Sequence, residues 1–246
     1  MVLKYFNPLL NFSVYYLMSG FLILLYLVGL LSFPPVKIIW QILPPILATF
    51  IFGTIYDYFE TKNLKPSLST LITGLIIGLV AQFGEQAWKL FLIGLAAVTF
   101  KFLIKINGKH IFNPAASGLL FGILALSSFP AWWGGERSPW IFYIFIPWLL
   151  LKYKRWAPIV SLLLPLIIFD GLAVLTSGSL LFFTSVMLIE PKTSPYTVRE
   201  GVIFGLVVGA GYLISTSFLD LDPLIGGLLI GNLTHNRFAI ISRRFL

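Results

Sequence analysis

The sequence predicts an all-α polytopic membrane protein. Of its 246 residues, 58% are hydrophobic and only 11% are charged, whereas about a quarter of the residues of a soluble domain are charged. The mean hydropathy is +0.94. Long apolar runs alternate with short gaps that hold most of the Lys and Arg residues, as in the cytoplasmic loops of membrane proteins. These three observations exclude a soluble globular domain, and an aromatic content of 16% excludes a disordered chain.

Composition also restricts the chemistry that the chain can perform. A net charge of +8 would suggest nucleic acid in a soluble protein, but here it fits membrane loops, so we expect a lipid bilayer and no nucleic acid as partner. The absence of Cys and the presence of only two His residues exclude disulfides and thiolate metal sites. We expect no metal site. The sequence has no phosphate-binding Gly-rich loop, zinc-protease motif or nucleophile elbow, and we assign no catalytic residue.

About ten membrane spans are expected along the chain. A span needs about 20 apolar residues, and broken helices need fewer. Pro44 and Pro45 predict a kink in the second span, and the segment 235–244 is expected to form a basic tail after the last one. The expected spans are 12–31, 38–56, 67–82, 88–104, 114–128, 140–151, 156–169, 179–189, 201–219 and 223–233.

The distribution of basic residues predicts the orientation of these spans. With the N-terminus in the cytoplasm, only Lys37, Lys89 and Arg137 of the 17 Lys and Arg residues lie outside, and the other 14 lie in cytoplasmic loops. Such an asymmetry is typical of correctly oriented membrane proteins. It supports an even number of spans and places both termini in the cytoplasm.

Two segments of the chain resemble one another. Residues 113–124 read NPAASGLLFGIL and residues 222–233 read DPLIGGLLIGNL, and the spans before them share an Ile-Gly-Leu or Phe-Gly-Leu sequence at nearly the same offset. Five spans per repeat is an odd number, so the halves must have opposite orientation in the membrane, as an inverted repeat. We therefore expect one membrane domain with pseudo-repeats at 1–128 and 139–246.

Each of these two segments opens with a helix-start signal. Asn113-Pro114 and Asp222-Pro223 both combine a good N-cap with Pro at the first helical position. The caps could merely complete backbone hydrogen bonding at a helix start near the membrane surface. Alternatively, the positive helix ends could line a functional site and hold an anion or a polar group.

Three acidic residues are candidates for an ion pathway. Asp170 follows an apolar span, Glu190 opens the sequence EPKTSP, and Asp222 precedes the tenth span. A carboxylate within a membrane is costly unless it has a partner or water, so such residues often handle ions or protons. The alternative is that they lie in helix ends or turns at the surface.

Several other residues are expected at the membrane surface. His110 lies beside Lys109 in a short basic turn, and Lys101 is in the last turn of the fourth span, from which it can reach the surface. Trp132 and Trp133 are expected in the aromatic belt of the membrane interface.

Two motifs resemble those of a known family. The run 108–115 reads GKHIFNPA, the run 190–195 reads EPKTSP, and STLITGLIIGLV at 69–80 also fits. They are similar to segments of the RnfD/NqrB family, whose members are membrane proteins of the Rnf electron transport complex and of the sodium-translocating NADH:quinone reductase. The resemblance implies a ten-helix inverted repeat like that of urea transporters, in a prokaryotic cell (inner) membrane. It also implies a role beside other membrane subunits in coupling electron flow to Na⁺ or H⁺ movement, and binding of FMN or riboflavin.

The sequence departs from this family at one functional point. The resemblance implies an FMN joined to a Thr in an S-G-A-T segment after the FNPA helix, but residues 127–138 read SSFPAWWGGERS and contain no Thr. We therefore do not expect covalent attachment, and we take Asn113, Pro114 and Lys109 as candidate flavin-binding residues. Glu190 also stands where the family has Asp. The alternative function is that of a redox-silent channel or transporter for a small solute, because a fold does not determine a function.

The charge distribution makes the position of the C-terminus testable. A reporter that is active only outside the cytoplasm, fused after Leu246, should remain inactive, because the positive-inside pattern places this end in the cytoplasm. The same reporter inserted in the 129–138 loop should be active. Activity at the C-terminus would contradict the ten-span arrangement.

Overall fold

The computed structural model describes residues 13–62, 67–106, 108–219 and 221–244, and the chain is mostly helical (78%). This confirms the all-α part of the prediction. Its helices are α2 (Val14–Gly29), α3 (Pro35–Thr61), α4 (Leu68–Val80), α5 (Ala87–Leu103), α6 (Pro114–Leu126), α7 (Trp133–Glu136), α8 (Pro139–Tyr153), α9 (Trp156–Asp170), α10 (Gly178–Phe182), α11 (Val198–Phe218) and α12 (Pro223–Arg244).

The remaining elements are short. A two-stranded antiparallel hairpin, β1 (Lys105–Ile106) and β2 (Lys109–His110), joins α5 to α6. A 3-10 helix (Leu172–Thr176) precedes α10, and a π-helical turn (Phe183–Met187) follows it. By length and composition, α3 and α11 are long and apolar enough to cross a membrane, and six other described helical segments are shorter apolar helices.

The expected spans agree with these helices to within a few residues, with two differences. The eighth expected span is α10 continued by the π-helical turn. The tenth helix is longer than expected, because α12 continues through the basic segment to Arg244. Residues 234–244 contain no Gly or Pro that would end a helix, so the helix extends past the apolar part of the segment.

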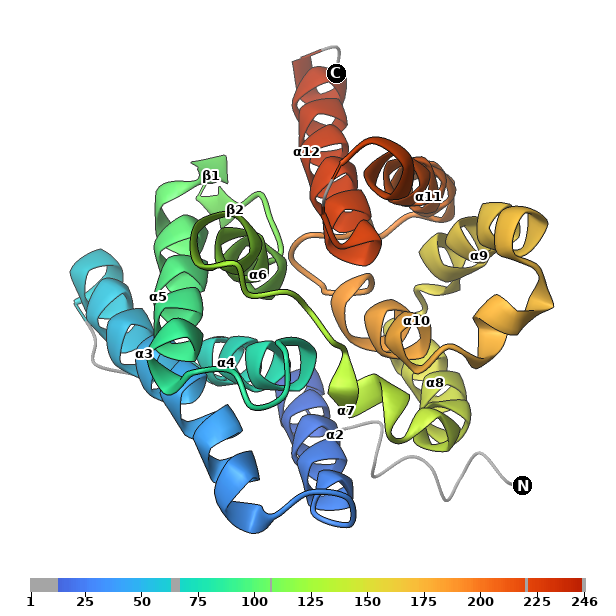
Figure 1. Ribbon diagram of the computed structural model, residues 1–246. Coiled ribbons are helices and arrows are strands. Elements are labelled where there is room, and N and C mark those ends of the chain that lie inside the picture. Colours follow the sequence, from blue (N-terminus) through green and yellow to red (C-terminus); the bar gives the residue numbers. More distant parts are fainter. Residues whose placement is uncertain (1–12, 63–66, 107, 220, 245–246) are drawn as a thin grey trace, which may run out of the picture.

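The helices form two similar groups (Figure 1). Helices α2 to α6, blue to green, lie on one side, and α8 to α12, yellow to red, lie on the other. In the first group α5 packs against both α3 and α6, and in the second group α11 packs against both α9 and α12. Helix α6 contacts α12, so the two segments with the repeated sequence meet between the groups.

Matched glycines allow these close contacts. A Cβ atom added at Gly118 of α6 would lie 2.6 Å from the carbonyl oxygen of Ile93, and one added at Gly227 of α12 would lie 2.6 Å from that of Val208. Side chains at these positions would push the helices apart. In both groups, therefore, the last helix packs backbone to backbone on the helix before it.

The expected positions of Trp132 and Trp133 at the membrane interface are wrong. Trp132 and Trp133 are 5% and 4% exposed, because the segment before α7 turns back into the protein. The amides of Ala131 and Trp132 donate to the carbonyl oxygen of Val80 (2.8 and 3.0 Å). The ring nitrogen of Trp133 donates to the carbonyl oxygen of Gly78 (2.7 Å), so hydrogen bonds inside the protein replace those expected at an interface.

Lys101 is also buried, against expectation. Only 6% of it is exposed, and its ammonium donates to the hydroxyl of Ser69 on α4 (3.2 Å) while lying 5.6 Å from the ring centre of Phe102. Lys101 is therefore held against α4 instead of reaching the surface.

The glycine contact between α5 and α6 predicts a large effect of a small substitution. Gly118→Ala should lower the free energy of unfolding by about 1–3 kcal/mol, because the added methyl group has no space beside Ile93 and Ala97. Gly20→Ala in α2 is the matched control, since no atom lies within 4 Å of a Cβ added there. Unfolding of both variants in the same detergent measures the difference, and equal stability would contradict the packing.

Candidate functional site

The candidate site begins at the buried residue that caps α6. Asn113 is 2% exposed, and its side-chain oxygen accepts a hydrogen bond from the amide of Ala116 (3.0 Å). Asp222 caps α12 in the same way, by accepting from the amide of Ile225 (2.9 Å). Both helix-start signals in the sequence are therefore confirmed as caps.

The carboxylate of Glu190 lies at the start of α6. One of its oxygens accepts hydrogen bonds from the side-chain amide of Asn113 (2.9 Å) and from the hydroxyl of Thr193 (2.9 Å). A negative charge at this position is favourable, because the N-terminal end of a helix carries a partial positive charge. The protein itself thus supplies the anion that the sequence suggested for this helix start.

Asn232, in the middle of α12, joins the two groups of helices at this point. It is fully buried, its side-chain oxygen accepts from the backbone amide of Asn113 (2.9 Å), and its side-chain nitrogen donates to the carbonyl oxygen of Thr193 (3.2 Å). One network therefore connects the start of α6, the loop after the π-helical turn and α12.

Arg155 holds the loop that carries Glu190, a role that sequence reasoning missed. Its guanidinium donates to the carbonyl oxygens of Glu190 and Ser194 (both 3.1 Å) and lies 4.1 Å from the ring centre of Tyr196. Arg155 is 4% exposed, and a charge so deeply buried requires such partners. One signal in the sequence could have suggested this role. The two prolines of EPKTSP have no backbone N–H group, so the carbonyl oxygens of this loop need donors from elsewhere in the protein.

The expected surface position of His110 is wrong, whereas Lys109 is at the surface. Side chains alternate along a strand, and on β2 Lys109 is exposed while His110 is 5% exposed. The Nε2 atom of His110 lies 3.7 Å from a carboxylate oxygen of Glu190. Lys109 does not line the pocket described next, so the structure separates it from Asn113 and Pro114.

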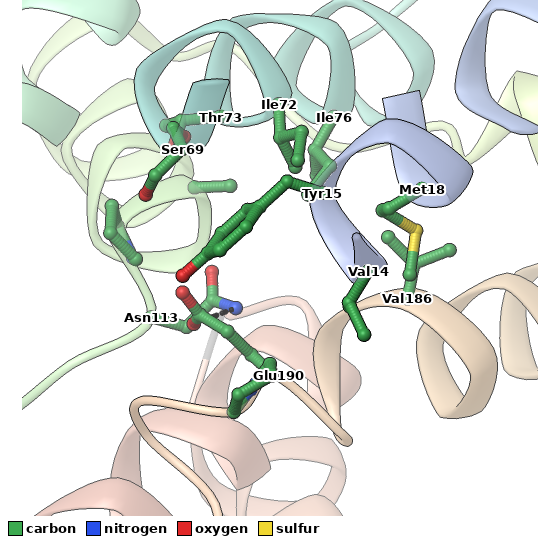
Figure 2. A pocket seen from close by; sticks show the side chains of 13 residues that line it. Val14, Tyr15, Met18, Ser69, Ile72, Thr73, Ile76, Asn113, Val186 and Glu190 are labelled. Carbon is green, nitrogen blue, oxygen red and sulfur yellow. Dashed lines mark hydrogen bonds between the residues drawn. The ribbon is translucent and has the colours of Figure 1, made fainter. Parts of the chain in front are cut away.

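A small pocket, with a cavity volume of about 50 Å³, borders this network (Figure 2). The side chain of Tyr15 extends toward Asn113 and Glu190, and the hydroxyl group of Ser69 lies near the same polar end. The apolar part is formed by side chains from α2, α4 and the π-helical turn. The residues that line the pocket are Val14, Tyr15, Met18, Ser69, Ile72, Thr73, Ile76, Asn113, Pro114, Ala115, Val186, Glu190 and Pro191.

The three candidate acids are not brought together. Asp170 is exposed at the last position of α9, and a carboxylate oxygen of Asp222 accepts from the ring nitrogen of Trp132 (2.8 Å). In the part of the chain that the structure describes, no hydrogen bond or ion pair joins Asp170, Glu190 and Asp222 to one another. Nor does this part contain a group of three or more His, Asp or Glu residues that could hold a metal ion.

Comparisons with family models and with curated proteins found no relative. The functional assignment must therefore depend on the two sequence motifs, the network that joins them and the pocket beside it.

Removing the bridge from α12 should destabilise the protein. In Asn232→Ala, the buried amide of Asn113 loses its acceptor, which costs about 1–3 kcal/mol. Thr234→Ala is the control, because among the described residues the hydroxyl of Thr234 donates to carbonyl oxygens of its own helix. Denaturant unfolding of both variants in detergent gives the two changes, and an Asn232→Ala protein as stable as Thr234→Ala would show that the bridge is unimportant.

Proposed function

We propose that this chain is a membrane subunit of an electron-transport complex that couples redox chemistry to Na⁺ or H⁺ movement, and that it binds a flavin. The observation that carries the proposal is the contact between the two motifs that resemble the RnfD/NqrB family. Asn113 of FNPA donates to Glu190 of EPKTSP across a separation of 77 residues. Motifs that share one buried network, beside a pocket, are arranged as a binding site would require.

Exposed apolar side chains support placement in a membrane. Helix α3 alone exposes Trp40 (59%), Phe50 (39%) and Phe59 (65%), and large exposed apolar patches are unusual on a soluble monomer. The corresponding packing of the two helix groups and their matched glycines support an inverted repeat of five plus five helices, with halves at 1–128 and 139–246. We propose that both termini lie in the cytoplasm.

The side chains that line the pocket match the chemistry of a flavin ring better than that of its phosphate. Met18, Ile72 and Ile76 offer apolar walls, and Asn113 with Pro114 lies at the polar end, where a ring edge needs hydrogen-bonding groups. The carboxylate of Glu190 would repel a phosphate there. Of the two flavins, we therefore favour riboflavin, held without a covalent bond, and a bound flavin would supply electron transfer.

Other membrane subunits follow from this assignment. The chain contains no Cys, so it cannot ligate an iron–sulfur cluster by itself, and a single flavin cannot carry electrons between distant donors and acceptors. We propose that neighbouring subunits deliver and remove the electrons. Glu190, which has a buried network on one side and the pocket on the other, is the strongest of the three acids as a group that interacts with the coupled ion.

The structure offers less support for the solute channel. The space between α6 and α12 is lined by apolar side chains, with one Ser as the exception. Both capped helix starts are already occupied by carboxylates of the protein, those of Glu190 and Asp222. A small polar solute would therefore meet neither free helix ends nor a polar path along this seam.

The flavin is tested by the absorption spectrum of the purified protein. We expect a yellow protein whose colour is released entirely to the supernatant by acid precipitation. Ile72→Phe, which fills the pocket, should lose most of the colour, whereas Leu71→Phe, the neighbouring residue that does not line the pocket, should retain it.

Other results would contradict the proposal in different ways. Colour that stays with the precipitated protein would show covalent attachment. A colourless protein that transports a small solute would favour the channel, and equal colour in Ile72→Phe and Leu71→Phe would place the flavin elsewhere.

A further inference from the structure

A second cavity lies between the two groups of helices. Its volume is about 280 Å³, and it lies between α5 and α6 on one side and α12 on the other. Its wall is apolar except for Ser117, whose hydroxyl already donates to the carbonyl oxygen of Pro114 (2.9 Å). An apolar cavity that offers no hydrogen bonds holds water poorly and suits a hydrocarbon chain. Leu120 of α6 and Leu233 of α12 are among the residues that line it.

Basic residues lie at one end of this second cavity, which is called the groove from here on. Ile104 and Phe112 line it and flank the β1–β2 hairpin, which carries Lys105 and Lys109. Lys105 is paired with Glu60. Lys109 is exposed, and within the described residues no carboxylate is in ion-pair distance of it.

We propose that this groove binds one acyl chain of an anionic phospholipid, with the lipid phosphate beside the β1–β2 hairpin. Anionic lipids are abundant in the cytoplasmic leaflet and bind basic sites between helices, and the charge pattern of the sequence places this hairpin on the cytoplasmic side. The inference depends on the membrane placement proposed above, and it is independent of the flavin.

The position of the groove gives the lipid a structural role. Helices α6 and α12 belong to different groups, and their polar connection through Asn113 and Asn232 lies at the buried start of α6. Leu120, Leu229 and Leu233 of these two helices line the cavity of about 280 Å³ instead of packing closely against one another. An acyl chain there would add apolar contacts to both helices, so binding stabilises the folded state by mass action.

The test compares lipids with different headgroups and the same chains. The full-length protein, purified in detergent and depleted of lipid, is titrated with dioleoylphosphatidylglycerol or dioleoylphosphatidylcholine while its melting temperature is followed. We expect the anionic lipid to raise the melting temperature by roughly 5 °C more than the zwitterionic lipid. Inorganic phosphate alone should have no effect.

Variants separate the headgroup contact from the chain contact. Lys109→Gln should remove much of the difference between the two lipids, and Lys154→Gln, an equal charge change at an exposed position after α8, should not. Leu233→Trp should fill the groove and reduce the effect of both lipids. Its control is Leu124→Trp, the corresponding position of the repeated segment, which is 70% exposed and lies outside the groove.

Several outcomes would overturn the proposal. These are equal shifts with the two lipids, the same shift with inorganic phosphate, and an unchanged lipid effect in Leu233→Trp. Protein that remains soluble without detergent would overturn both this proposal and the membrane placement. A colourless protein that still prefers the anionic lipid would contradict the flavin alone and support the lipid site.

Discussion

The hydrogen bond from Asn113 to the carboxylate of Glu190, at the start of α6, is the interaction on which the site depends. The first amides of any helix lack partners within the helix, and α6 begins inside the protein, where each unpaired polar group costs free energy. Asn113 satisfies one amide through its side-chain oxygen and uses its side-chain nitrogen to hold Glu190. The partly buried carboxylate needs hydrogen-bond partners in turn, which Asn113 and Thr193 supply. The helix start and the EPKTSP loop therefore stabilise each other, and Arg155 and Asn232 add further hydrogen bonds to them.

Helix α12 meets the same constraint by different means. Asp222 is at once the cap and the negative charge, and the ring nitrogen of Trp132 is its further donor. This explains why Trp132 is buried, since the indole has a charged acceptor to reach. The difference matters for function. At α6 the carboxylate belongs to Glu190 of a separate loop and borders a pocket. At α12 the carboxylate belongs to the cap Asp222 itself and accepts from the indole of Trp132. The two helix starts are therefore not equivalent as binding sites.

The sequence predicted the helices and caps well because both depend on neighbouring residues. Apolar runs bounded by charges mark the helices, and Asn-Pro and Asp-Pro mark two starts. It did not predict the burial of Arg155, His110 or Lys101. Counting charges assigns a basic residue to a loop, but only tertiary structure shows that the loop folds inward. The same holds for Asn232, which ends the apolar part of α12 and whose partners lie far away in the chain.

The bridge between the groups bears on the choice between the two proposed functions. Transporters built from inverted repeats commonly work by rocking one part against the other. Here such a movement would separate Asn113 from Asn232 and leave buried polar groups unpaired, at about 1–3 kcal/mol for each group. The adjacent loop is held further by several hydrogen bonds from the buried Arg155. A subunit that keeps a cofactor in a fixed position benefits from this rigidity, because electron transfer requires a constant geometry around the cofactor. The network therefore fits a redox subunit better than a rocking transporter.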